Sequence, residues 1–155
     1  MPTVDAEREG DASVHLVVRR TIAAAPERVF AAWTRPEHLT RWWGPPGVTC
    51  PTAEVDLRVG GRYRIANRLP DGALLWITGT YELIDAPRRL VYSWAHEPVD
   101  EGTAYSRVTV RFEPRERGTE VIVIHERLAD AASRERHRLG WRGCLDGLAA
   151  AERDG

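Results

Sequence analysis

Apolar positions along the chain follow two different periods, and the changes between them mark the expected elements. β-Branched residues predict a strand over Val14–Ile22 (VHLVVRRTI). Apolar residues at helical spacing then predict one helix over Ala24–Trp33 and a second over Thr34–Trp43. Thr34 and Glu37 have the spacing of a capping box at the start of the second helix. The sequence GPPG follows directly and must end that helix.

After GPPG the pattern indicates strands joined by short turns. Asp71-Gly72 and Ala86-Pro87 have turn sequences, and strands joined by such turns are antiparallel neighbours. Together with the first strand they predict one sheet of about seven strands. The strands expected after GPPG are Ala53–Leu57, Arg62–Arg68, Leu74–Ile84, Arg89–Trp94, Ser106–Glu113 and Thr119–Arg127.

A long helix is expected over Asp130–Arg153. One stripe of this helix holds His137, Trp141, Cys144, Leu145 and Leu148. Gly140, Gly143 and Gly147 interrupt it, and each weakens a helix by about 1 kcal/mol relative to alanine. Two interpretations explain them: close approach of a strand backbone, which we favour, or space left beside the helix for a ligand.

The order of elements predicts an α+β fold in which a curved antiparallel sheet wraps around the C-terminal helix. That helix is the only element large enough to cover one face of the sheet. The two short helices can only seal one end, which places Trp42 and Trp43 at its rim. Trp42 follows Leu39 by three residues and is expected on the internal face, whereas Trp43 should lean over the rim beside Gly44–Gly47.

Length and charge indicate one domain without a nucleic-acid or membrane partner. The chain has 155 residues and a net charge of -1, and its arginines form no basic stripe. We expect residues 13–153 to form the domain and Met1–Ala12 to be a flexible tail. The tail lacks the apolar core of a signal peptide, and no apolar run is long enough to span a bilayer. A cytoplasmic protein is therefore expected.

Aromatic residues suggest a pocket for a flat apolar molecule, although they also suit a plain core. The chain has six tryptophans, which is more than packing a sheet against one helix ordinarily needs. The candidate ligand-binding residues are Trp42, Trp43, Tyr63, Ile65, Trp76, Tyr92, Trp94, Val108, Val110, His125, His137 and Trp141.

Three polar residues are candidates for the interior. His125 shares the parity of Val123, and an inward imidazole can act as acid, base or hydrogen-bond donor. The alternative is a histidine whose hydrogen bonds are satisfied within the protein. His137 lies on the apolar stripe of the long helix. Arg20 lies in the first strand and, if buried, needs an anionic partner.

Signals for established catalytic machinery are weak. The chain has no GxSxG, HExxH or P-loop motif. Cys50 and Cys144 lie far apart without metal-ligand spacing, so neither a metal ion nor a cofactor is expected. Cys144 is expected to be a small core residue, and Cys50, which follows GPPG, is expected to be more exposed.

Four blocks in succession resemble one known family. They are RTIAAAPERVFAAWTRPEHLTRWWGPPG, DLRVGGRYR, GTYELIDAPRRLVYSW and GWRGCLDGLAA. They are similar to the AHSA-like family, which shares a domain with the activator of the heat-shock-protein-90 ATPase and belongs to the START/SRPBCC helix-grip superfamily. The resemblance covers about Val14–Ala151 and implies a helix-grip fold with a cavity between sheet and long helix. It implies no single function, because relatives bind lipids, plant hormones or polyketides and some are enzymes.

Three functional hypotheses follow, of which the first is favoured. A module that binds a small apolar or aromatic molecule requires a pocket of several hundred Å³ beside Trp42 and Trp43. A cyclase, hydratase or hydrolase would use His125, Arg20 or a tyrosine, and needs polar groups that converge in the cavity. A chaperone-associated protein is the third. In the namesake an additional N-terminal domain binds the chaperone, whereas the expected tail here is too short to form a domain.

Overall fold

The computed structural model describes residues 14–154, which form one seven-stranded antiparallel sheet and three helices. The order of strands across the sheet is β1-β7-β6-β5-β4-β3-β2. This arrangement confirms the expected α+β class. The elements are β1 (Val14–Ile22), α1 (Pro26–Thr34), α2 (Pro36–Trp42), β2 (Ala53–Val55), β3 (Arg62–Arg68), β4 (Leu74–Asp85), β5 (Arg89–His96), β6 (Ser106–Arg115), β7 (Gly118–Leu128) and α3 (Ala131–Asp154).

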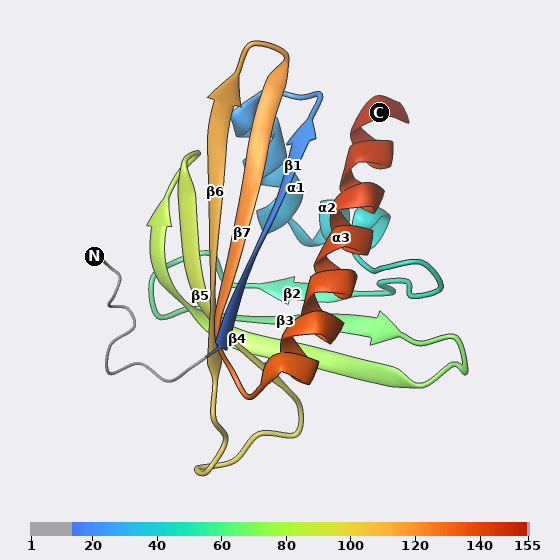
Figure 1. Ribbon diagram of the computed structural model, residues 1–155, viewed down its shortest axis with the longest axis vertical. Helices are drawn as coiled ribbons and strands as arrows, with labels where there is room; N and C mark the ends of the chain where they lie inside the picture. Colours follow the sequence, from blue (N-terminus) through green and yellow to red (C-terminus); the bar gives the residue numbers. More distant parts are fainter. Residues whose placement is uncertain (1–13, 155) are drawn as a thin grey trace.

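The sheet is strongly bent. In Figure 1, β1, β7 and β6 run along the long axis of the molecule, whereas β2 and β3 run across it. The pairing of β4 with β5 shifts register between Tyr81 and Leu83, and such irregularities bend a strand and increase its twist. The bend gives the sheet a concave face on which a single helix can lie.

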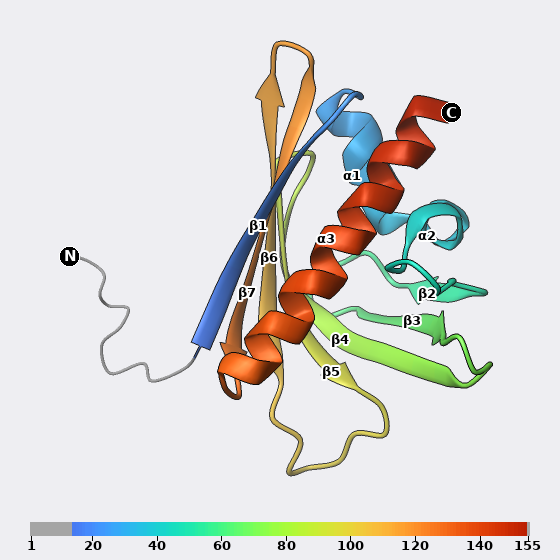
Figure 2. The same ribbon diagram turned by 45° about the vertical axis from the view of Figure 1, so that its right-hand side comes forward.

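Helix α3 covers this concave face. It packs on β1 and β7 and meets α2, as Figure 2 shows from the side. Trp141, Cys144, Leu145 and Leu148 form its buried side, as the apolar stripe predicts. Asp130 caps its start, because its carboxylate accepts the backbone N–H of Ser133 at 2.8 Å.

The boundary between α1 and α2 differs from the prediction. Arg35 precedes Pro36 and has an extended backbone (φ −108°, ψ 127°), because proline disfavours the helical conformation in the residue before it. α2 therefore begins at Pro36, and Thr34 remains at the end of α1, where its hydroxyl donates to the carbonyl of Phe30 at 2.9 Å. The expected capping box of Thr34 and Glu37 was wrong.

Most strand faces point as their alternation predicts, and β4 is the exception. Trp76 was expected to face the cavity, yet it lies on the outer face, with the guanidinium of Arg64 4.0 Å above its ring. Ile77 points inward instead, because it pairs across the sheet with the inward-facing Ile65. Both parities of the LLWIT sequence carry apolar residues, so alternation could not distinguish them.

Two further expectations concern the N-terminal tail and membrane-spanning helices. The expected tail, Met1–Ala12, lies outside the described residues. Within residues 14–154, no helix combines the length and apolar character needed to cross a membrane.

Candidate ligand-binding pocket

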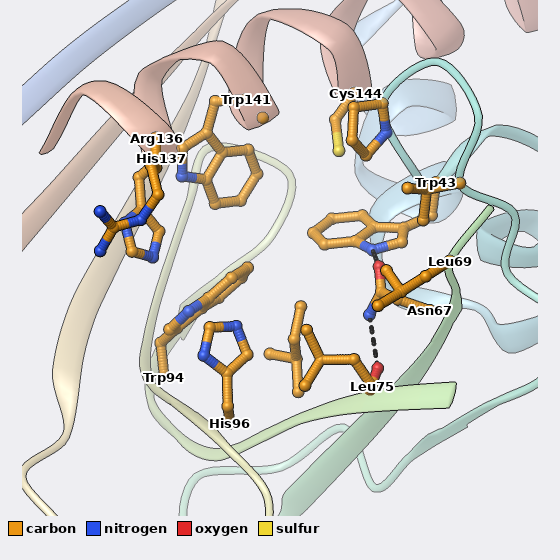
Figure 3. A pocket seen from close by; sticks show the side chains of 14 residues that line it. Trp43, Asn67, Leu69, Leu75, Trp94, His96, Arg136, His137, Trp141 and Cys144 are labelled. Carbon is orange, nitrogen blue, oxygen red and sulfur yellow. Dashed lines mark hydrogen bonds between the residues drawn. The ribbon is translucent and has the colours of Figure 1, made fainter. Parts of the chain in front are cut away.

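A pocket of about 280 Å³ lies between α3 and the bent end of the sheet. Its walls come from α3, the facing ends of β3 and β4, the end of β5 and the loop after α2, and Figure 3 shows their side chains around one space. The lining residues are Trp43, Pro45, Val48, Asn67, Leu69, Leu75, Ile77, Trp94, His96, Arg136, His137, Gly140, Trp141 and Cys144. Most of them are apolar, and the polar ones are few.

Three tryptophans form one continuous aromatic wall of the pocket. The ring centroid of Trp43 lies 6.2 Å from that of Trp94 and 5.6 Å from that of Trp141, and the last two are 5.4 Å apart. The indole N–H of Trp43 donates to the side-chain oxygen of Asn67 at 3.0 Å, which fixes the orientation of the ring. Because these rings hold one another, the wall has a defined shape before any ligand enters.

The adjacent residues Trp42 and Trp43 have different roles. Both are buried, with 4% and 5% of their surface exposed. Trp42 is a core residue, as predicted, and its indole N–H donates to the carbonyl of Ala32 at 2.9 Å. Trp43 is a pocket wall and does not lean over the rim. It follows the last helical residue with an extended backbone (φ −69°, ψ 137°), so helical spacing does not set its direction.

The three glycines of α3 also differ in role. A Cβ atom at Gly147 would lie 2.6 Å from the carbonyl oxygen of Trp42, and one at Gly143 would lie 2.7 Å from the Cβ atom of Pro45. Close approach therefore explains these two, although the partners are the last residue of α2 and the loop after it, and not a strand. A Cβ atom at Gly140 would meet nothing within 4 Å, and Gly140 lines the pocket. The ligand-space interpretation fits Gly140.

His96, Arg136 and His137 gather at one side of the pocket, opposite Trp43, Leu69 and Cys144 (Figure 3). The rings of His96 and His137 are stacked with their centroids 6.4 Å apart. Partial burial, and then the neighbouring His137, lower the pKa of His96. The pocket thus has an apolar end and an end that carries basic groups.

His125 lies behind this wall and is fully buried. The indole N–H of Trp141 donates to its Nδ1 atom at 3.1 Å, so the proton of the neutral ring is on Nε2, which lies 2.8 Å from the hydroxyl of Ser106. That hydroxyl donates to the carbonyl of Trp94 at 3.2 Å. Burial, with smaller contributions from His137 and His96, lowers the pKa of His125 to about 3. Both ring nitrogens are satisfied within the protein, which supports the alternative interpretation of this residue.

Only part of the predicted set reaches the pocket. Trp43, Trp94, His137 and Trp141 line it. Tyr63, Ile65 and Tyr92 instead surround a separate void of about 10 Å³, which is too small for any ligand larger than water. The remaining predicted residues that lie outside the pocket are Trp42, Trp76, Val108, Val110 and His125.

Two tyrosines beside the small void are fixed by hydrogen bonds. The hydroxyl of Tyr63 donates to the carbonyl of Ser93 at 2.6 Å, and the hydroxyl of Tyr92 accepts the indole N–H of Trp33 at 3.1 Å. Burial raises the pKa of both tyrosines well above their usual range. Both therefore serve as neutral core residues at physiological pH.

Arg20 and Cys50 are not where the sequence suggested. Arg20 forms an ion pair with Asp146 of α3, and both side chains are partly exposed, so the arginine stays out of the cavity. Cys50 is buried, with only 4% of its surface exposed, and belongs to the hydrophobic core. Burial raises the pKa of Cys50 to about 11 and that of Cys144 to about 12, so both are thiols at neutral pH.

Within residues 14–154, no group of three or more His, Cys, Asp or Glu side chains is arranged to hold a metal ion. Sequence reasoning missed pocket residues near strand ends and in loops, where periodicity carries little information, and also two residues of α3. Asn67 offered a signal, since it is a polar residue on the inward parity of Tyr63 and Ile65. The missed residues are Pro45, Val48, Asn67, Leu69, Leu75, Ile77, His96, Arg136 and Cys144.

A bent antiparallel sheet that grips one long helix, with a pocket between them, defines a helix-grip protein of the START/SRPBCC type. The chain belongs to the family described as activator of Hsp90 ATPase homolog 1-like protein, whose sequence model matches residues 23–152. The resemblance noted from the four sequence blocks is thereby confirmed.

Solved structures share the fold over nearly the whole length. A Chromobacterium violaceum protein has 29% identity and a TM-score of 0.79, with 89% of this chain and 96% of that chain covered. The AHSA1 protein of Silicibacter pomeroyi has 29% identity, a TM-score of 0.78 and the same coverage of 89% and 96%. The AHSA1-like protein of Aeromonas hydrophila has 28% identity and a TM-score of 0.71, with 88% and 90% covered. No curated protein matches the chain.

Proposed function

We propose that this protein binds a small apolar or aromatic molecule in the pocket between α3 and the sheet. The observation that carries the proposal is a space of about 280 Å³ with a preformed aromatic wall and basic groups gathered at one end. Small-molecule sites typically have this combination, with volumes of about 300–1,000 Å³. A bicyclic aromatic molecule is the size class that suits it.

Gly140 supports a pocket that is kept open. A glycine within a helix weakens it by about 1 kcal/mol relative to alanine, and Gly140 has no close neighbour that would require it. Every larger side chain at this position would project into the space. Selection for an unobstructed pocket accounts for the glycine, whereas a solid core would favour a residue that fills the gap.

The enzyme hypothesis named from the sequence is less well supported. His125 has both nitrogens engaged within the protein, Arg20 pairs with Asp146, and the two fixed tyrosines lie away from the pocket. The groups chosen for catalysis therefore do not converge on the space that a substrate would occupy.

Fluorescence titration with the neutral probe N-phenyl-1-naphthylamine tests the proposal. We expect saturable binding of one probe per chain to the wild-type protein. Gly140→Leu should abolish it by filling the pocket, while the matched variant Gly140→Ala should retain it. Urea unfolding of both variants verifies that they are folded. Absence of saturable binding, or equal binding by Gly140→Leu, contradicts a ligand site in this pocket.

A further inference from the structure

The polar groups of the pocket differ in whether they remain available to a ligand. Asn67 is fully used, because its amide N–H₂ donates to the carbonyls of Ile65 and Leu75 and its oxygen accepts from Trp43. His96, Arg136 and His137 are the other polar side chains that line the pocket, and all carry or can take a positive charge. No aspartate or glutamate lines it. His137 donates its Nδ1–H to the carbonyl of Ser133 at 2.8 Å, so the atom that it offers a ligand is Nε2. A histidine nitrogen donates only when it carries a proton, whereas the guanidinium of Arg136 is always a cationic donor.

Arg136 is the strongest of these groups. Its side chain is exposed and lines the pocket, next to His137 in the first part of α3. The acidic residue beside it in sequence, Glu135, pairs with Arg134 and Arg138. Among the described residues, no carboxylate forms an ion pair with Arg136. Its guanidinium can present two parallel N–H groups to an anion at the pocket mouth.

A buried donor lies at the same end. The indole N–H of Trp94 is buried and has no hydrogen-bond partner among the described residues. The Trp94 ring centroid lies 6.4 Å from that of His96 and 6.3 Å from that of His137. A buried N–H without an acceptor is destabilising, so a ligand acceptor atom that reaches this N–H would bind more tightly.

We propose that the ligand is an amphipathic anion, with a flat apolar body against the tryptophan wall and a carboxylate or similar group between Arg136, His96 and His137. This inference rests on the proposed function and specifies its ligand class. The arrangement keeps the charged group at the exposed mouth, where His96 and Arg136 reach solvent, so the anion is not fully desolvated. The apolar body displaces water from the interior of the pocket.

Calorimetric titration with 2-naphthoate and its neutral isostere 2-naphthamide tests the charge preference at neutral pH and low salt. A charge-assisted hydrogen bond predicts that naphthoate binds at least about tenfold more tightly than naphthamide. Arg136→Gln should reduce this ratio to about threefold or less while leaving the affinity for naphthamide unchanged. The matched control Arg138→Gln removes the same charge from the same helix outside the pocket and should keep the wild-type ratio.

Three other outcomes would overturn either the anion preference or the proposed function. Equal binding of the two compounds to the wild-type protein overturns the anion preference and leaves the pocket as an apolar binding site. Equal loss of naphthoate affinity in Arg136→Gln and Arg138→Gln assigns the preference to general charge attraction and also overturns it. Binding of neither compound, together with no uptake of N-phenyl-1-naphthylamine, overturns the proposed function itself.

Discussion

At the scale of single residues, His125 shows how a buried titratable group can serve structure alone. An indole N–H can only donate, so its bond from Trp141 requires an unprotonated Nδ1 atom. Protonation of the ring would break that bond and place a charge in a fully buried site. The imidazole is therefore neutral in the folded protein at every physiological pH.

We expect His125 to lower the stability of the folded protein as the pH falls below neutrality. Its pKa is about 3 in the folded protein and 6.5 in the unfolded chain, so below pH 6.5 the unfolded state binds more protons. Stability is complete above the unfolded pKa and decreases as pH falls toward the folded pKa. Between about pH 7 and pH 5 this residue should contribute a loss of about 2 kcal/mol.

Urea unfolding of the wild-type protein and His125→Gln at both pH values measures this loss. Glutamine offers a donor and an acceptor but does not titrate, so the variant should lose less stability on acidification. His96 remains in both proteins and cancels from the comparison. An identical pH dependence of the free energy of unfolding in the two proteins would show that folding does not lower the pKa of His125.

Substitution by alanine is expected to have opposite effects on stability at two of the helical glycines. Gly147→Ala should destabilise the protein by about 2 kcal/mol or more, because its methyl group would overlap the carbonyl oxygen of Trp42. Gly140→Ala should stabilise it by up to about 1 kcal/mol, since the methyl group meets open space and alanine favours a helix. Thermal or urea unfolding of the pair distinguishes the roles, and effects of the same sign would contradict the assignment.

At the scale of elements, the residue that caps the start of α3 also influences the position of the pocket residues on this helix. Its N-terminus follows β7 directly, so the cap determines where the buried stripe begins relative to the sheet. Two residues of α3 that line the basic end of the pocket, Arg136 and His137, lie within its first two turns. The cap therefore affects both the stability of the helix and the position of Arg136 and His137.

Asp130→Ala should destabilise the protein by about 1 kcal/mol, because it removes the acceptor of the Ser133 N–H. Asp130→Asn retains an acceptor and should have a much smaller effect. Urea unfolding of both variants at neutral pH measures the difference. Equal losses would mean that charge near the helix start, and not the capping hydrogen bond, is what matters.

The elements differ in how accurately the sequence predicted their bounds and their buried faces. β1 and β3 have the expected bounds, and α3 differs by one residue at each end, because long periodic segments specify their own type and face. The start of α2 was mispredicted because Pro36 restricts Arg35 more strongly than Thr34 can cap. The face of β4 was mispredicted because Trp76 and Ile77 are both apolar and only pairing with β3 decides between them.

The pocket was predicted less fully than the fold for a related reason. Trp94 and Trp141 lie on periodic elements and were found, and Trp43 was found from its place at the end of α2, whereas Leu69, Leu75 and His96 lie where strands end. Their positions depend on how the sheet bends, and register shifts such as the one between β4 and β5 increase this bend. Local sequence patterns do not encode this shift, so residues brought together by it cannot be recognised one by one.

At the scale of the whole molecule, the domain has a solid part and an open part. β7 lies between β1 and β6, and α3 packs on β7 and β1. The facing ends of β3 and β4 have the pocket on one side and solvent beyond their turn. The open part therefore has fewer packed neighbours and should open locally more often.

Hydrogen exchange measured by NMR should reflect this division. We expect amides of β7 to exchange only through global unfolding, and amides near Asn67 and Leu75 to exchange faster through local opening. Saturation with N-phenyl-1-naphthylamine should narrow the difference, because the probe packs against the open part. Uniform protection across both parts without the probe would contradict a division into solid and open parts.

The contacting tryptophans also make the protein its own optical sensor. Trp33 contacts Trp42 with centroids 4.9 Å apart and is stacked on Trp141 at 6.0 Å, and Trp141 in turn contacts Trp43 and Trp94. Transitions of aromatic rings this close couple electronically, so five of the six indoles act as one chromophore in circular dichroism. Three of them border the pocket, and a molecule that enters it must change their shared spectrum without any added label.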